Sequence, residues 1–245
     1  MTCSTDRYTA TFVVAPSLGP ADCRDADFTD IQTAINALPP SGGKVFVKAG
    51  TYVVSQTIRV QQSNVHIQGE GMGITNIVTA STMTASPAIQ VYNSQAGGVL
   101  PLLAATSKGD ISATLSPAHA ATLTPGDYVL LFSNKPVDAE DHKKHAGELK
   151  QVVTVNAVTG TITFDDQIYD AYLLADGAGM ARITVLHNIA LSDLSVTTLA
   201  PFYTATSGFI VFRFVDNLQV DVLAHSSLMR ARRNSREPRN ALSIP

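Results

Sequence analysis

The sequence contains no tryptophan and only two cysteines, and charged residues make up just 15% of its 245 positions. No run of eighteen or more apolar residues occurs, so the sequence predicts no membrane-spanning helix. Residues 1–8 are polar and lack the apolar segment of a secretory signal peptide. Cys3 and Cys23 have no metal-ligand spacing, which argues against a zinc site. A disulfide between them and two free thiols both remain open.

The charge is small and unevenly distributed. The 17 basic and 20 acidic residues give a formal net charge of −3, which argues against nucleic acid or an anionic membrane surface as the main partner. Residues 228–245 hold five arginines and one glutamate, which leaves 12 basic and 19 acidic residues, or −7, in the rest. Hydrophobic residues reach 45%, enough to exclude disorder. We therefore expect a folded acidic body followed by an irregular basic tail.

One short helix stands before a long series of strands. Apolar residues recur at helical spacing from Ile31 to Leu38. Thr29 or Asp27 is expected to cap this helix, and Pro39 and the proline after it end it. Beyond it, short β-branched and aromatic runs alternate with Gly, Asn or Ser, which predicts strands.

A four-residue pattern, Asn–apolar–any–apolar, begins at Asn64, Asn188 and Asn217. The last two lie 29 residues apart, a plausible length for one coil of a solenoid. Strands that repeat in this way suggest parallel stacking into a β-helix. Asparagine suits the corners, because it tolerates a left-handed backbone and can hydrogen-bond to the adjacent coil.

The middle of the chain does not follow this repeat pattern. Residues 128–132, 151–155 and 161–164 are strand-like and separated by turn signals, which predicts antiparallel hairpins within an insertion at about 105–185. A long polar loop is expected over residues 138–148. The expected organisation is an N-terminal segment (1–26), one domain with this insertion (27–227) and the basic tail (228–245).

Three segments carry a family resemblance: residues 27–39 (DFTDIQTAINALP), 43–52 (GKVFVKAGTY) and 65–71 (VHIQGEG). Together they resemble the opening of the pectate-lyase-like superfamily of right-handed parallel β-helices. The resemblance implies that the helix caps the open N-terminal end and that the G-T-Y strand begins the first coil. It implies an all-β fold, a right-handed parallel β-helix with an N-terminal capping helix and an antiparallel β insertion.

The insertion adds to this resemblance. Residues 126–131, 147–149 and 160–169 resemble an insertion in bacterial polysaccharide-degrading β-helix proteins and phage tailspikes. This implies a polysaccharide partner, an extracellular or virion-associated location and, for a tailspike, a homotrimer. Because the coil pattern stops after residue 227, we expect a truncated member, a frameshifted or vector-derived tail, or an end completed by other subunits. We expect no robust turnover from this chain, because the catalytic residues of such proteins usually lie in central and later coils.

The fold hosts several reactions, so function must come from the site. A polysaccharide lyase or glycoside hydrolase is the first hypothesis, and a non-catalytic structural or receptor-binding module of a trimeric tailspike is the second. The start of the chain also resembles pectin methylesterases, but their later Gln–Asp pair and arginine segment are missing, which ranks an esterase last.

Two groups of residues are candidates for chemistry in the insertion. Asp165 and Asp166 could serve as the acid and base of glycoside cleavage, although adjacent strand residues point to opposite faces and aspartate is also a common turn former. The polar loop could bind a divalent ion, or it could simply be solvated. Its candidate ligands are Asp141, His142, His145 and Glu148.

A third group lies on the expected solenoid strands. Lyases of the resembled superfamily typically bind Ca²⁺ through carboxylates and remove a proton with Arg or Lys. The resemblance makes Asp193, Asp221 and Arg213 candidates here. Asp193 and Asp221 occupy comparable positions in consecutive coils and are expected to stack on one exposed face. No cofactor is certain, and a bound Ca²⁺ is the one that this group would hold.

Overall fold

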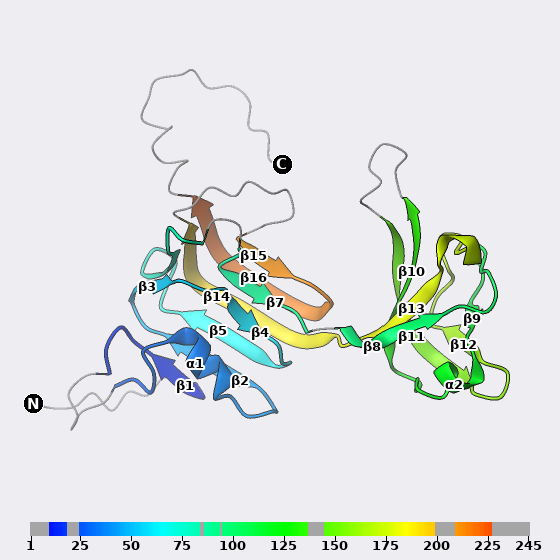
Figure 1. Cartoon of the computed structure of the whole chain (residues 1–245). Helices are drawn as coiled ribbons and strands as arrows, with labels where there is room; N and C mark the ends of the chain where they lie inside the picture. Colours follow the sequence, from blue (N-terminus) through cyan, green and yellow to red (C-terminus); the bar gives the residue numbers. More distant parts are fainter. Residues whose placement is uncertain are drawn as a thin grey trace, which may run out of the picture. The chain divides into compact units, whose positions relative to one another are not determined.

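The computed structural model describes residues 10–18, 25–83, 86–93, 95–136, 145–198 and 209–226. It consists mainly of strands and divides into two compact units, one of Met1–Tyr92 with Leu186–Pro245 and one of Asn93–Val185 (Figure 1). We call them unit 1 and unit 2. Both cysteines and the basic tail lie outside the described residues.

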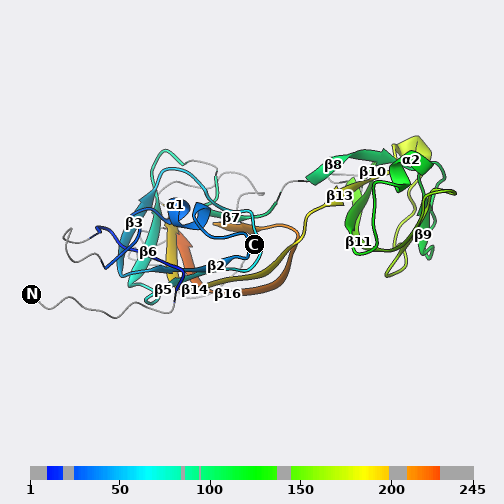
Figure 2. The same ribbon diagram turned by 90° about the horizontal axis from the view of Figure 1, so that it is seen from below.

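Unit 1 is built from parallel strands that curl into three lines (Figures 1 and 2). β1, β2, β5, β14 and β16 form one line, β3, β6 and the second half of β14 form another, and β4, β7 and β15 form the third. Neighbours in each line come from successive passes of the chain, so the expected parallel stacking is confirmed. The elements are β1 (Phe12–Val14), α1 (Ile31–Asn36), β2 (Gly43–Val47), β3 (Gly50–Val54), β4 (Ile58–Val60), β5 (Val65–Gly69), β6 (Thr75–Thr79), β7 (Ile89–Val91), β14 (Leu186–Thr198), β15 (Ile210–Phe212) and β16 (Val215–Ser226).

The core of unit 1 follows from strand alternation. Val45, Ile67 and Leu191 occupy one register row across β2, β5 and β14 and are all buried. The residues before and after each of them along its strand face outward, because successive side chains of a strand point to opposite faces. Ile58 and Ile89 are also paired and buried in the third line. Stacked aliphatic rows thus fill the interior. The alternate residues lie outside these rows, where Phe46 of β2 packs in a small second apolar cluster.

The N-terminal helix begins at a different cap from the one expected. Asp30, and neither Thr29 nor Asp27, is the N-cap residue, because the first helical residue is Ile31. The Asp30 carboxylate accepts a hydrogen bond from the backbone N–H of Thr33 at 2.7 Å. Asp27 instead accepts a bond from the backbone of Val13 in β1.

A column of left-handed residues forms one corner of unit 1. Gly42, Asn64, Asn188 and Asn217 have φ angles of 86°, 60°, 56° and 53°. The amide of Asn217 donates to Asn188 at 2.6 Å, and that of Asn188 donates to Asn64 at 2.7 Å. A Cβ atom on Gly42 would lie 2.2 Å from the carbonyl oxygen of Asn64, so glycine ends the column. The corner role predicted for asparagine is confirmed.

The middle member of this column provides a stability test. We expect Asn188→Ala to lower the opening free energy of β14 by about 2 kcal/mol, because it loses two side-chain hydrogen bonds and places a Cβ in the left-handed region. Asn188→Gly should cost about 1 kcal/mol, since glycine accepts that backbone conformation. Amide hydrogen exchange of β14 and β16 measures both. Equal losses would contradict a contribution from the left-handed backbone.

Unit 2 is antiparallel, as the hairpin signals predicted. Its sheet has the order β8-β13-β10-β11-β12-β9, and all its strand pairs run antiparallel. The predicted polar loop through Glu148 ends earlier than expected, because β11 already begins at His145. The elements are β8 (Gln95–Pro101), β9 (Ser112–Thr114), α2 (Pro117–Ala120), β10 (Tyr128–Pro136), β11 (His145–Asn156), β12 (Thr161–Phe164), the 3₁₀ turn Leu174–Asp176 and β13 (Gly179–Ile183).

Candidate functional site

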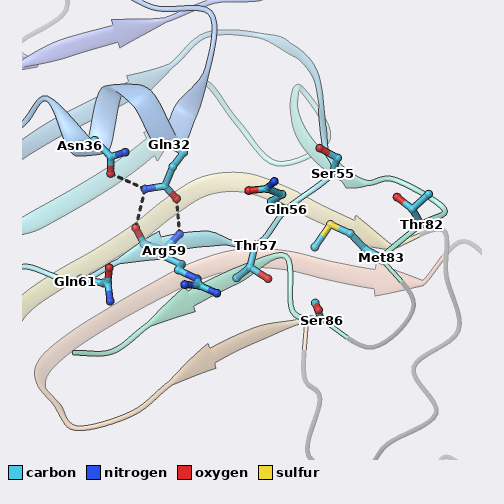
Figure 3. A pocket seen from close by; sticks show the side chains of 10 residues that line it. All are labelled: Gln32, Asn36, Ser55, Gln56, Thr57, Arg59, Gln61, Thr82, Met83 and Ser86. Carbon is cyan, nitrogen blue, oxygen red and sulfur yellow. Dashed lines mark hydrogen bonds between the residues drawn. The ribbon is translucent and has the colours of Figure 1, made fainter. Parts of the chain in front are cut away.

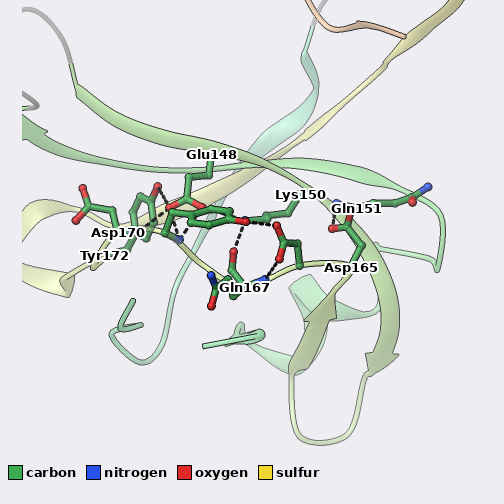
Figure 4. Close-up of polar contacts among 9 residues, drawn as sticks. Glu148, Lys150, Gln151, Asp165, Gln167, Asp170 and Tyr172 are labelled. Carbon is green, nitrogen blue, oxygen red and sulfur yellow. Dashed lines mark hydrogen bonds and ion pairs between the residues drawn. The ribbon is translucent and has the colours of Figure 1, made fainter. Parts of the chain in front are cut away.

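The densest polar network of the described residues lies in unit 2 around Glu148 (Figure 4). Its carboxylate accepts hydrogen bonds from the backbone N–H groups of Tyr169 and Asp170 and from the hydroxyl of Tyr172, at 2.8–3.0 Å. Burial alone raises the pKa of Glu148, but these bonds and the ammonium of Lys150 outweigh it and hold the pKa below its ordinary value. The carboxylate is therefore ionised and its oxygens are occupied.

Lys150 completes this network. Its ammonium lies 3.0 Å from Glu148, donates to the carbonyl of Gln167 at 2.5 Å and stands 4.5 Å from the centre of the Tyr169 ring. The side chain of Lys150 is only 4% exposed. A buried pair whose hydrogen bonds are all made internally has no group left for a ligand, so the network fastens the segment after β12 to β11.

Asp165 and Asp166 lie just beyond the end of β12 and serve this turn. Asp165 accepts from the backbone of Gln151 at 2.9 Å, and Asp166 accepts from the backbone of Gln167 at 2.7 Å and from the hydroxyl of Tyr169. The hydroxyl of Tyr169 and the N–H of Gln167 lower the pKa of Asp166. The two carboxylates thus bond to different parts of the chain and present no common face.

The two candidate metal ligands that the structure describes, His145 and Glu148, point to opposite faces of β11. His145 is exposed on β11, whereas Glu148, three residues later, points to the opposite face and into the network. Asp141 and His142 lie outside the described residues. Within the part of the chain that the structure describes, no three His, Cys, Asp or Glu side chains gather as a metal site would require.

The outer face of unit 1 carries a hydrogen-bonded polar row on β5 and β14. Gln68 donates to Asp193 at 2.8 Å, the hydroxyl of Ser192 donates to the same oxygen at 3.0 Å, and His66 Nε2 lies 3.1 Å from Ser192 Oγ. Since a hydroxyl has one proton, His66 must donate to Ser192, and it cannot then act as a base toward that serine. Partial burial and the charge of Lys44 lower the pKa of His66.

Asp193 also borders a hollow of about 590 Å³ on this face. Glu70 lines the same hollow, so two carboxylates from different passes of the chain face one space. Asp193 has a φ of 58°, and the pairing of β14 shifts register there. The hollow is lined by Phe46, Gln68, Gly69, Glu70, Ile74 and Asp193.

The register shift means that Asp193 and Asp221 do not stack as expected. Asp221 pairs with Ser192, because Asp193 is an extra residue in a bulge of β14. Arg213 lies between β15 and β16, where its backbone N–H donates to Val91. Among the described residues, no hydrogen bond or ion pair joins Arg213 to either aspartate. The sequence carries a signal of this bulge, because two residues separate Leu191 from Leu194 whereas one separates Val220 from Val222.

A second hollow, of about 620 Å³, lies beside α1 and β4 (Figure 3). The side-chain amide of Gln32 in α1 makes two hydrogen bonds with the backbone of Arg59. Its oxygen accepts from the Arg59 N–H at 2.6 Å, and its nitrogen donates to the Arg59 carbonyl at 3.1 Å. Sequence reasoning missed this hollow, although the I-R-V alternation of β4 already placed Arg59 outward. It is lined by Gln32, Asn36, Ser55, Gln56, Thr57, Arg59, Gln61, Thr82, Met83 and Ser86.

The comparisons with known proteins concern both units. Residues 99–184 match the family model described as "K1 capsule-specific polysaccharide lyase, Rider domain". This match covers about a third of the chain and lies entirely within unit 2, which runs from Asn93 to Val185. No curated protein matches the chain. Within the described residues, no helix is long and apolar enough to cross a membrane.

Solved phage tailspikes resemble the chain in fold. The Pseudomonas phage phi297 tailspike gp61 matches over 80% of this chain and 30% of its own, with a TM-score of 0.55 and 20% identity. The gp54 tailspike of Acinetobacter baumannii bacteriophage AP22, solved with A. baumannii capsular saccharide, matches over 81% and 34%, with a TM-score of 0.56 and 16% identity. Tailspike protein gp49 from Pseudomonas phage LKA1 matches over 80% and 41%, with a TM-score of 0.53 and 18% identity.

The likeness covers a part of each of these tailspikes. The chain spans between 30% and 41% of the length of the solved tailspikes that it matches. At 16–20% identity the likeness concerns the fold. The chain therefore has an all-β architecture with a curled parallel sheet and structural neighbours among phage tailspikes.

Proposed function

We propose that this chain is a polysaccharide-binding part of a tailspike-like protein, with unit 1 a right-handed parallel β-helix into which unit 2 is inserted. The observation that carries the proposal is the polar row of His66, Gln68, Ser192 and Asp193 beside an open hollow on the outer face of the sheet. Hydrogen-bonding groups fixed across neighbouring strands suit the hydroxyls of a linear saccharide. The match of unit 2 to a domain of a capsule-specific lyase supports the same substrate class.

Location and assembly follow from the same proposal. A tailspike-like protein acts outside the cell or on the virion, and a homotrimer is the assembly that we expect for the intact spike. We propose no resident cofactor. A divalent-ion site that includes Asp141 and His142 stays a prediction for residues that the structure does not describe.

Binding without turnover is the first form of this proposal. The carboxylates of Asp165 and Asp166 hold the turn after β12 together, so we do not propose these two as an acid and base pair. Glycoside hydrolysis is the second form, because Glu70 and Asp193 border one hollow and paired carboxylates are the groups that this reaction uses. Both already accept hydrogen bonds, Glu70 from the backbone N–H of Ala49 and Asp193 from Gln68 and Ser192, so hydrolysis ranks after binding. The two forms differ in whether a bound polymer is shortened.

An array of purified bacterial capsular polysaccharides tests the proposal on the intact 245-residue chain. We expect saturable binding to at least one polymer, and Asp193→Asn should weaken it about tenfold, because the charged acceptor of Gln68 and Ser192 is lost. Asp176→Asn in unit 2 removes the same charge and should change nothing. Absence of binding across the array would refute the function.

Size-exclusion chromatography of the bound polymer separates the two forms. Binding with an unchanged polymer length supports the non-catalytic form. Shortening that disappears in both Glu70→Gln and Asp193→Asn, with the fold intact by circular dichroism, supports hydrolysis. Shortening that survives both substitutions would place the reaction elsewhere in the chain.

A further inference from the structure

The hollow beside α1 and β4 has the size and lining of a ligand site (Figure 3). Its volume of about 620 Å³ falls within the range of about 300–1,000 Å³ typical of small-molecule sites. Amide and hydroxyl side chains make up most of its wall, and Arg59 is its single charged residue. Neutral donors and acceptors around one fixed cation recognise a polar ligand that carries one negative group.

Arg59 is held in place by contacts that do not use its side chain. Ile58 and Val60 on either side of it are buried, so strand alternation turns Arg59 outward. Gln32 fixes its backbone N–H and C=O. In the described part of the chain, the guanidinium has no carboxylate partner. None of its five donors bonds to a described residue, and they match a carboxylate in bidentate geometry.

An adjoining hollow of about 310 Å³ extends this surface. It shares Asn36, Arg59 and Gln61 with the first and is also lined by Gln62. The side-chain nitrogen of Gln62 is buried and has no acceptor among the described residues. Buried donors normally have a partner, so this wall lacks one hydrogen-bond acceptor. Arg59 lies where the two hollows meet.

We infer that the groove formed by these two hollows binds a saccharide residue bearing an acidic group, with Arg59 paired to that group. Gln32, Asn36 and Gln61 supply amides for the hydroxyls of the same or the next sugar. The groove shares no lining residue with the hollow at Asp193, so it is a second saccharide site of unit 1. The inference rests on the proposed function and adds the charge of the ligand.

The test uses the intact chain and each capsular polysaccharide of the array in two forms, native and carboxyl-reduced. We expect Arg59→Gln to weaken binding to a native acidic polymer at least about tenfold, the usual effect of losing one charge-assisted pair. The affinity of Arg59→Lys should lie between those of the unsubstituted chain and Arg59→Gln, because lysine keeps the charge but not the bidentate geometry. Lys108→Gln, an exposed lysine of unit 2, is the control with the same charge change.

Each outcome has a definite meaning. If Arg59→Gln loses binding only to the native acidic polymer, the result supports the inference. If Arg59→Gln and the unsubstituted chain bind equally well, the inference is overturned but the proposed function stands. The same holds if Arg59→Gln loses binding equally to native and carboxyl-reduced polymers, which would give Arg59 a structural role. If the unsubstituted chain binds no polymer in either form, the proposed function itself fails.

Discussion

Replacing Glu148 by alanine is expected to lower the unfolding free energy of unit 2 by about 4 kcal/mol, the usual cost of removing one partner of a buried ion pair. The substitution leaves the ammonium of Lys150, which is 4% exposed, without its counter-charge. It also frees the backbone N–H groups of Tyr169 and Asp170 and the hydroxyl of Tyr172. The segment after β12 then loses its main attachment to β11.

Two further variants distinguish the lost pair from lost packing. Lys150→Met alone should cost a similar amount, whereas Glu148→Ala with Lys150→Met should cost clearly less than the two single changes added, because no unpaired charge stays buried. Asp176→Ala is the surface control and should stay within about 0.5 kcal/mol. Hydrogen exchange of the β10, β11 and β12 amides reports the opening of unit 2. Additive losses would contradict a coupled pair.

The same carboxylate gives unit 2 a pH dependence with a known sign. The pKa of Glu148 lies below its ordinary value of 4.5, so the folded state binds its proton less readily than the unfolded state. The stabilisation is therefore complete above about pH 4.5 and is lost as the pH falls through the folded pKa. Glu148→Ala should lack this part of the acid transition.

Much of the fold could be predicted because its signals are local. The asparagine pattern at Asn64, Asn188 and Asn217 indicates residues with a left-handed backbone, a conformation that each coil needs at the same corner. The hairpins of unit 2 follow from alternation and turn residues in the same way. Handedness has no such local signal, because it depends on how successive strands connect in space.

The candidate site was less accessible to sequence reasoning, because its contacts join distant segments. The pairing of Gln32 with Arg59 spans 27 residues, and that of Gln68 with Asp193 spans 125. Pattern reasoning also placed Asp193 and Asp221 in one row, because the sequence does not show whether Ser192 or Asp193 is the unpaired residue of the bulge. Carboxylate density pointed to Asp165 and Asp166, but density does not reveal whether a carboxylate is already hydrogen-bonded.

The bulge at Asp193 depends on a glycine in the neighbouring strand. A Cβ atom on Gly69 of β5 would lie 2.2 Å from the backbone oxygen of Asp193 and 2.9 Å from the Cβ of Thr75. One of these backbones must then move, so we expect Gly69→Ala to cost about 3 kcal/mol of stability, near the upper end for overpacking. Gly98→Ala, where nothing lies within 4 Å, should cost under about 1 kcal/mol.

Because Gly69 and Asp193 line the same hollow, this substitution also tests how the fold shapes the candidate site. Gly69→Ala should weaken polysaccharide binding by at least as much as Asp193→Asn, about tenfold, since it displaces the acceptor shared by Gln68 and Ser192. Binding to the separate groove at Arg59 should persist in both variants. Thermal unfolding and the polysaccharide array measure the two effects on the same protein. A folded Gly69→Ala chain with normal binding would contradict the requirement for a backbone that passes this close to the bulge.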